Sequence, residues 1–171
     1  MNIYRLYNRP HDLLHHDMLI TTAKQLELDV FWEDMGEFRR IGGGERDIAN
    51  SARFSYLYAK NVLDARFPEG EEEIAKDGDY AIRYAKYVIK DRFPEGEDAI
   101  AKDVMNSLAY ARLIDGRFEK GEAKIAKTAL RSWIYAANII KDRFPLGEAK
   151  MKNTKFWEKY IKSMSELGIE I

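Results

Sequence analysis

The sequence predicts an all-α protein, an α-solenoid of about five repeats in which each repeat holds a short helix and a long helix. Three observations lead to this fold class. A short segment recurs at a fixed period, a good helix N-cap residue follows each copy, and an apolar pattern with helical spacing comes next. The chain has 171 residues, 46% of them hydrophobic, which is enough for one domain with a substantial core.

The recurring segment reads Arg-Phe-Pro-Glu-Gly-Glu in its two clearest copies, at residues 66–71 and 92–97. Looser copies occupy residues 117–122 and 143–148, and a divergent copy occupies residues 40–45. The arginines that open successive copies are separated by 26, 26, 25 and 26 residues. A fixed period of this length is typical of stacked-repeat proteins.

Each copy is predicted to open a short helix, which spans residues 68–76 in the second repeat. Proline stands at or near the first position of this helix, where its missing N–H costs little. An Ile-Ala pair lies near the end of the helix in four repeats, and Met151-Lys152 replaces it in the last. Because a helix of about two turns is marginal in water by itself, neighbouring helices must hold it in place.

One residue then separates the short helix from the long helix, and its side chain is that of a good N-cap in every repeat. The oxygen of such a side chain accepts a hydrogen bond from a free backbone N–H of the first helical turn. The five predicted N-cap residues are Ser51, Asp77, Asp103, Thr128 and Thr154.

The long helix is expected at residues 77–90 in the second repeat, where Tyr80, Tyr84, Ala85 and Val88 fall on one side at helical spacing. The Tyr-Ala pair recurs in the first, third and fourth repeats. The tyrosine can fill the gap between helices, and the alanine lets two backbones approach. The long helix should stop before Arg-Phe-Pro, because the residue before proline disfavours the α region.

Three parts of the chain depart from this pattern. The third repeat is one residue short near Gly116, which predicts a tighter turn there. The fifth repeat has drifted, as expected of a terminal cap, with Phe156, Trp157, Tyr160 and Ile161 in place of the regular pattern. Residues 1–39 lack a copy and are predicted to be a mostly helical N-terminal segment or cap, ahead of a repeat domain at 40–171.

Composition limits the classes of function. The net charge of −1 argues against a protein whose affinity comes from many phosphate contacts. The chain has no cysteine, and therefore no disulfide frame and no thiolate zinc site. No apolar run approaches the ~18 residues of a membrane span, and the N-terminus lacks the apolar core of a signal peptide. We therefore expect a cytoplasmic protein that does not act at a membrane.

Arginine and glutamate recur at both ends of the repeated segment in the four C-terminal copies. An active site needs its residues only once, so a feature of every repeat more reasonably serves the structure. These residues are predicted to form ion pairs between repeats and contacts at helix ends. A charged ladder that a partner reads is the alternative. The pairs are Arg66 with Glu71, Arg92 with Glu97, Arg117 with Glu122, and Arg143 with Glu148.

Two motifs near the N-terminus have a chemical alternative. His11 and His15 would share one face of a helix and could hold a metal, and His16-Asp17 resembles the His-Asp pair of metal-dependent phosphohydrolases. A polar cap surface is the simpler interpretation, since the repeats occupy the rest of the chain. The glycine run at 42–44 lacks the preceding strand and the Gly-Lys-Ser/Thr ending of a phosphate loop, so it is interpreted as a flexible first turn.

The side of the long helices opposite the inward tyrosine and alanine is a candidate binding surface. One row of such positions is mainly basic, a second row is apolar at both of its ends, and three aromatic residues lie nearby. Apolar side chains on a nominally exposed row suggest a partner surface, and packing against the N-terminal segment or inside the core between repeats is the alternative. The candidate partner-binding residues are Tyr56, Leu57, Lys60, Arg83, Lys86, Tyr87, Arg112, Trp133 and Ile134.

The combination of Arg-Phe-Pro-Glu-Gly-Glu, Ile-Ala-Lys-Asp and Tyr-Ala-x-x-Val-Ile-Lys resembles short α-helical repeats of about 26 residues in tailed-phage proteins and in some bacterial and giant-virus proteins. The resemblance extends from residue 40 to about residue 162 and is best over residues 64–111. It implies a phage origin, and small phage accessory proteins of this kind often bind and disable, or redirect, a host protein. These repeats share no catalytic residues that could be carried over.

We therefore expect a non-enzymatic protein-binding module without a cofactor, which in a phage setting would bind and inhibit a host defence or regulatory protein. Self-association through the apolar row is compatible with this function. Nucleic-acid binding along the basic row, with Tyr87 and Trp133 stacking on bases, is the first alternative. A metal-dependent hydrolase that uses the histidine cluster is the second.

Overall fold

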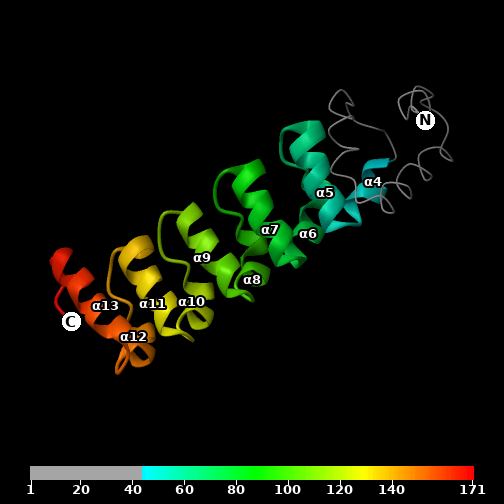
Figure 1. Cartoon of the computed structure of the whole chain (residues 1–171). Helices are drawn as coiled ribbons and strands as arrows, with labels where there is room; N and C mark the ends of the chain where they lie inside the picture. Colours follow the sequence, from blue (N-terminus) through cyan, green and yellow to red (C-terminus); the bar gives the residue numbers. More distant parts are fainter. Residues whose placement is uncertain (1–43) are drawn as a thin grey trace, which may run out of the picture. The chain divides into compact units, whose positions relative to one another are not determined.

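A computed structural model of the chain describes residues 44–171 (Figure 1). Every regular element in this range is helical, and the described residues contain no strand, so the all-α prediction is confirmed for them. The predicted N-terminal segment at 1–39, with its histidine cluster, lies outside the described residues. The chain forms two compact units, Met1–Ile74 and Ala75–Ile171, and each is described by itself.

The short helices begin where the sequence predicted. The second of them, α6 (Pro68–Lys76), has the predicted bounds. An isoleucine, or Met151 in the last repeat, is completely or almost completely buried in each short helix. The other short helices are α4 (Gly44–Ala49), the 3₁₀ turn η3 (Pro94–Gly96) followed by α8 (Glu97–Ile100), α10 (Glu119–Ile125) and α12 (Pro145–Met151).

The long helices begin directly after the five predicted N-cap residues. Three of these residues also cap with their side chains: Asp77 accepts from two backbone amides at 2.9 and 3.1 Å, Asp103 does the same, and Thr154 accepts from one. Ser51 and Thr128 have the extended N-cap backbone without a side-chain bond. The long helices are α5 (Ala52–Tyr58) with η1 (Ala59–Leu63), α7 (Gly78–Tyr84) with η2 (Ala85–Ile89), α9 (Val104–Leu113), α11 (Ala129–Ile134) with η4 (Tyr135–Ile140), and α13 (Lys155–Glu166).

The long helix of the second repeat ends at Ile89 with Lys90 as its C-cap, which agrees with its predicted range of 77–90, and the first four long helices end in the same manner. Each is followed by a non-glycine residue in the left-handed region, such as Lys90 at φ 59°, which ends the helix several residues before the proline position. A left-handed residue after the last turn lets a following backbone N–H reach back to a free carbonyl of that turn. The left-handed residue therefore ends the helix, and not the Arg-Phe-Pro segment to which the prediction assigned the stop. The left-handed residues at these ends are Asp64, Lys90, Asp115 and Lys141.

The missing residue of the third repeat is explained by a difference in helix type. The elements η1, η2 and η4 are π-helical turns, whereas α9 remains α-helical to its end. A π turn holds one residue more than an α turn. Accordingly, the backbone N–H that closes the helix donates to a carbonyl six residues earlier in the first repeat, from Ala65 to Ala59. In the third repeat it donates to a carbonyl only five residues earlier, from Gly116 to Ala111. The predicted tightening thus lies in the last helical turn before Gly116.

Deleting Tyr87 is therefore expected to cost less than about 1 kcal/mol of unfolding free energy. Tyr87 lies in the π turn η2 and is 47% exposed. Without it, the sequence after Tyr84 reads Ala-Lys-Val-Ile-Lys, which matches Ala-Arg-Leu-Ile-Asp of the third repeat, and η2 can become α-helical. Urea unfolding of the purified variant measures the loss.

Deletion of Leu113 is the matched control, because α9 has no surplus residue to lose. This variant is expected to be destabilised by several kcal/mol, since α9 has no π turn to shorten and the chain after the deletion must shift relative to the buried residues before it. Equal destabilisation by the two deletions would show that η2 cannot lose its extra residue by becoming α-helical.

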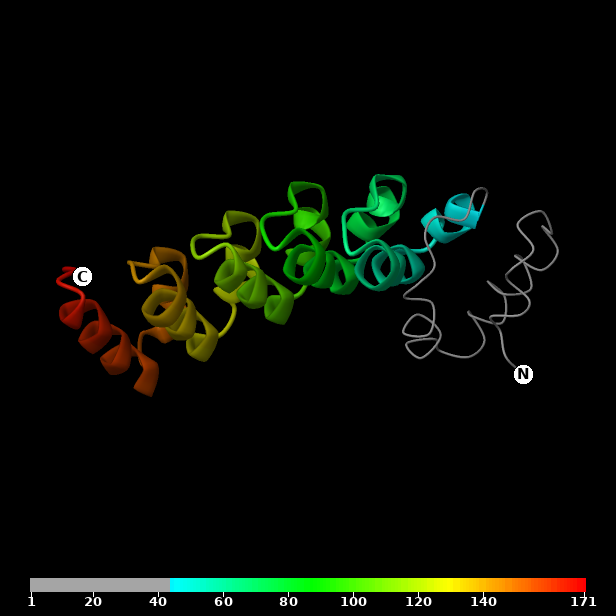
Figure 2. The ribbon, with the colours of Figure 1, turned by 90° about the horizontal axis from the view of Figure 1, so that it is seen from above.

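The second unit contains two rows of helices (Figure 2). The long helices contact one another in the order α7, α9, α11 with η4, and α13, while α8, α10 and α12 form the row of short helices. Each short helix also packs against the long helix of the preceding repeat. Between the rows, Tyr84 packs edge-on against Phe93, with ring centroids 5.3 Å apart, and Tyr110 packs in the same way against Phe118. These aromatic pairs form the core.

The glycine of the repeated segment lies where a short helix crosses the preceding long helix. A Cβ atom at Gly121 would lie 2.6 Å from a ring carbon of Phe118 and 2.7 Å from Cβ of Ser107. Gly96 faces Ala81 and Gly147 faces Ser132 in the same manner. Small residues on both sides of the crossing therefore set how closely the two rows approach.

Candidate protein interface

The recurrent arginine and glutamate form ion pairs within the repeated segment. The nitrogen–oxygen distances are 2.7 to 2.9 Å in all four copies from Arg66 to Glu148. The predicted location between repeats is wrong for these pairs, because five residues separate the two partners and the same segment supplies both. Arg117 also contacts the Asp142 carboxylate at 3.1 Å and donates to the backbone carbonyl of Arg143, the first residue of the next copy.

A buried tyrosine hydroxyl completes each of these pairs in the second unit. The hydroxyl of Tyr110 accepts from the backbone N–H of Phe93 at 2.8 Å and donates to Glu97 at 3.1 Å. Tyr135 makes the same two bonds in the fourth repeat. Tyr160 makes them in the fifth, so this tyrosine keeps the regular role and was wrongly interpreted as drift. We call this arrangement the tyrosine lock; it accounts for the recurrent charged residues structurally.

Alkaline pH is expected to weaken the tyrosine lock. Burial of the ring raises the pKa of Tyr110 to about 12, and the neighbouring Glu97 carboxylate adds to the rise. Since the pKa of an unfolded tyrosine is about 10, this stabilisation is complete below about pH 10 and is lost as the pH rises toward about 12. Tyr110 alone is expected to lower the free energy of unfolding by about 1.4 kcal/mol per pH unit in this range. Urea unfolding at about pH 9, 10 and 11 measures it, and a midpoint that stays constant would contradict the prediction.

The outward side of the long helices in the second unit forms a separate surface, which we call the long-helix face. Its positions lie five and one residues before, and two residues after, the buried tyrosine of each helix, which places them on the side opposite the core. Most of them are exposed, and only Ile134 and Ala137 are half-buried. The residues of the long-helix face are Asp79, Arg83, Lys86, Met105, Ala109, Arg112, Leu130, Ile134, Ala137, Lys155, Lys159 and Lys162.

The two central helices supply the apolar part of this face. Met105 is 57% exposed and Leu130 is 43% exposed, and both are large apolar side chains. Met105 and Ala109 belong to α9, and Leu130 belongs to α11, which continues into η4. Helix α9 contacts η4 directly. We call Met105, Ala109, Leu130, Ile134 and Ala137 the apolar strip.

Cations lie on both sides of the apolar strip. Arg83 and Lys86 lie on α7 and η2 at one side, and Lys155 and Lys159 lie on α13 at the other. Within the described part of the chain, none of these four side chains forms an ion pair, in contrast with the arginines of the tyrosine lock. The one carboxylate on the face, Asp79, accepts a hydrogen bond from the Asn106 side chain at 2.7 Å. The long-helix face is therefore basic.

Trp133 and Phe156 form an aromatic edge next to the apolar strip. Their ring centroids are 6.1 Å apart with an interplanar angle of 29°, and the indole N–H donates to the Ser163 hydroxyl at 3.3 Å. The Lys159 ammonium lies 5.1 Å from the Trp133 ring centroid. This edge joins α11 to α13 and fixes Lys159 beside the strip.

The candidate binding residues predicted from sequence fall into four groups. Arg83, Lys86 and Arg112 are exposed on the long-helix face, as expected, and Tyr87 lies at its border. Trp133 and Ile134 are half-buried on α11. Lys60 is exposed but belongs to the first unit. The nine predicted residues omit Met105 and Leu130, which lie five residues before the buried tyrosine, a row that the sequence interpretation did not consider.

Tyr56 and Leu57 do not belong to an exposed surface. They are only 4% and 6% exposed. Helix α5 is buried without interruption from Phe54 to Tyr58, so residues on all of its sides are covered. A helix that is apolar all round is buried all round. The prediction that Tyr56 and Leu57 contact a partner is wrong for this reason.

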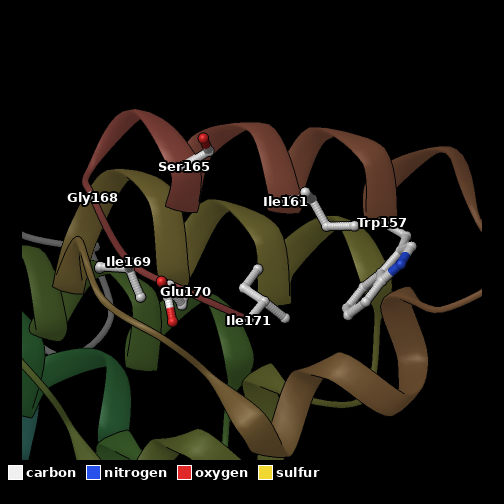
Figure 3. A pocket seen from close by; sticks show the side chains of 7 residues that line it. All are labelled: Trp157, Ile161, Ser165, Gly168, Ile169, Glu170 and Ile171. Atoms are coloured by element: carbon white, nitrogen blue, oxygen red, sulfur yellow. The ribbon is translucent and has the colours of Figure 1, made fainter.

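A cavity of about 620 Å³ lies beside the last long helix (Figure 3). Trp157 and Ile161 of α13 line it, together with the chain end at Gly168–Ile171, and Ile161 is 43% exposed. Trp157 stands three residues before the buried tyrosine, where the other long helices have serine or alanine, and Ile161 stands where they have the alanine after that tyrosine. Glu170 is its one titratable side chain, so the cavity has no acid–base pair.

The described residues contain no group of histidine, aspartate and glutamate side chains that could hold a metal ion. The proposed ligands His11 and His15 lie outside the described range, and the metal alternative stays a prediction. Among the helices of residues 44–171, none is long and apolar enough to cross a membrane.

Comparison with known proteins gives no relative for this chain: no protein-family model, no curated protein and no solved structure matches it. The interpretation of the long-helix face therefore rests on its own geometry and charge.

Proposed function

We propose that this chain is a non-enzymatic protein-binding module, an α-solenoid of helix pairs that binds its partner through the long-helix face. The observation that carries this proposal is a contrast between two sets of positions. Residues of the tyrosine lock and the glycine crossing recur from repeat to repeat and contact one another. Residues of the long-helix face differ from repeat to repeat, and most are exposed. Repeat proteins commonly bind through such an extended surface on a repeating framework.

The solenoid arrangement is supported by the contacts of the second unit, where consecutive repeats pack against each other along both rows. The same tyrosine, glutamate and serine contacts occur in the first unit, at Tyr58, Glu45 and Ser55. A repeat of this kind cannot bury its core alone, which favours a continuous array. The resemblance to tailed-phage repeats is the reason to place the partner in a host cell, as a host protein that the module inhibits.

Affinity purification of the full chain from cells of its host, followed by mass spectrometry, tests the proposal. The test variant carries Arg83→Glu and Arg112→Glu on the long-helix face. The control variant carries Lys127→Glu and Lys150→Glu, which reverse the same charge at exposed positions outside this face. We expect one protein at near-stoichiometric yield with the wild type and the control, and its loss with the test variant.

Two outcomes would overturn the proposal. The first is that no protein is recovered at comparable yield with the wild type. The second is that the test variant, shown by circular dichroism to be folded, retains the protein that the wild type recovers.

Nucleic acid is the second candidate partner, because the unpaired cations of the long-helix face could also contact phosphates. A filter-binding assay with single-stranded DNA distinguishes the two candidates. Binding that weakens steeply with salt and is lost with Arg83→Glu and Arg112→Glu would favour nucleic acid.

A further inference from the structure

We propose that the long-helix face binds an acidic amphipathic helix of its partner protein, with apolar side chains on the apolar strip and carboxylates toward the cations on both sides. This inference rests on the proposed protein-binding function and adds the chemistry of the partner segment. It follows from three features of the face: the exposed apolar strip, the unpaired cations that border it, and the contacts of its aromatic rings.

The apolar strip indicates that the partner segment carries apolar side chains along one side. Met105 and Leu130 are exposed large side chains on neighbouring helices, with Ile134 half-buried beside them. Burial of such side chains contributes about 25 cal/mol per Å² of apolar surface removed from water. The unbranched Met105 can also adjust to the shape of the side chain that it meets. A single stripe of apolar side chains at helical spacing is the complement of such a strip.

The cations on both sides of the apolar strip indicate that the partner segment is acidic. Arg83 and Lys86 border the apolar strip on the α7 side, and Lys155 and Lys159 border it on the α13 side. Because these side chains have no carboxylate partner among residues 44–171, a carboxylate brought by the partner replaces no existing ion pair. Complementary charge on both sides of an apolar centre fixes orientation and raises the rate of association.

The aromatic side chains favour a protein partner over a nucleic acid. Tyr80, Tyr87 and Trp133 each have a cation within 5.0 to 5.6 Å of the ring centroid, from Arg83, Lys86 and Lys159 respectively. A base that stacks on one of these rings would have to compete with the cation–π contact. The apolar strip itself holds methionine and aliphatic side chains, which suit leucine or phenylalanine better than a base.

Fluorescence anisotropy with the full chain and a labelled helical peptide tests this inference. The probe is a peptide of about 18 residues with leucines at helical spacing and glutamates on both sides of that stripe. The neutral control replaces the glutamates by glutamine, the scrambled control keeps the composition without the stripe, and a third probe is single-stranded oligothymidine. We expect the acidic striped peptide to bind at least about tenfold more tightly than each of these three.

Variants of the chain locate the binding to this face. Arg83→Glu with Lys159→Glu is expected to weaken binding of the acidic peptide by about tenfold or more, as is Met105→Glu, while Lys150→Glu on α12 leaves it unchanged. Equal binding of the glutamine peptide, or tighter binding of oligothymidine, overturns the inference. If no peptide binds while the wild-type chain still recovers its protein partner, the acidic-helix inference fails and the protein-binding proposal stands.

Discussion

Replacing Tyr110 by phenylalanine is expected to lower the free energy of unfolding by about 3 kcal/mol. The ring is fully buried, and its hydroxyl is the partner of both the Phe93 amide and the Glu97 carboxylate. Glu97 is 7% exposed, so water can replace the lost hydrogen bond only in part. The Phe93 amide is left buried without a partner, which costs about 1 to 3 kcal/mol, while Glu97 loses one hydrogen bond, worth about 1 kcal/mol, and keeps its ion pair with Arg92.

Urea unfolding and hydrogen exchange measure this effect separately. The Phe93 amide should exchange faster in Tyr110→Phe, because its acceptor is gone. Tyr87→Phe is the matched control, since the same atom is removed from a ring that is 47% exposed, and we expect a change of less than about 0.5 kcal/mol. If the Tyr110→Phe variant is as stable as the Tyr87→Phe control, the Tyr110 hydroxyl does not stabilise the tyrosine lock.

Replacing Gly121 by alanine is expected to cost about 2 kcal/mol of unfolding free energy. The new Cβ would lie 2.6 Å from the Phe118 ring and 2.7 Å from Cβ of Ser107, and neither atom is at the free end of a flexible side chain. Overpacking of this kind costs about 1 to 3 kcal/mol or more. The better helix propensity of alanine returns only about 1 kcal/mol.

Gly116→Ala is the control for this substitution, because the nearest atom to its Cβ would be the Ile114 carbonyl oxygen at 3.7 Å, an ordinary contact. This variant should be neutral or more stable by up to about 1 kcal/mol, because alanine restricts the unfolded chain. In the double variant Gly121→Ala with Ser107→Gly, part of the lost free energy of unfolding should return. Equal stability of the two single variants would contradict close packing at the crossing.

Much of the repeat could be predicted from sequence because its signals are local. Proline at 68, the N-cap at Asp77 and the apolar spacing around Tyr84 each act within one or two turns, and the structure places helices accordingly. The end of the long helix was predicted at the right residue in the second repeat, but the feature that ends the helix was not. A lysine or aspartate in the left-handed region has no distinctive sequence signal, and a π turn is visible only as one extra residue in the comparison of repeats.

The candidate interface was predicted less well, for a physical reason. Arg83, Lys86 and Arg112 could be placed on the outward side because helical spacing alone decides it. The burial of Tyr56 and Leu57 depends on what covers α5, which periodicity does not report. The role of the tyrosine hydroxyl was also missed, because it depends on the distance between two helices of a repeat and not on either helix alone.

The two bulky residues on α13 also change the side of this helix on which the other long helices receive a short helix. Serine or alanine at the place of Trp157, and alanine at the place of Ile161, leave room for the glycine-bearing helix that comes next in the chain. Trp157 and Ile161 place larger side chains at these two positions of α13, where they line the cavity beside the helix. A glycine-bearing short helix of the kind that packs closely on the other long helices would therefore be overpacked on this side of α13.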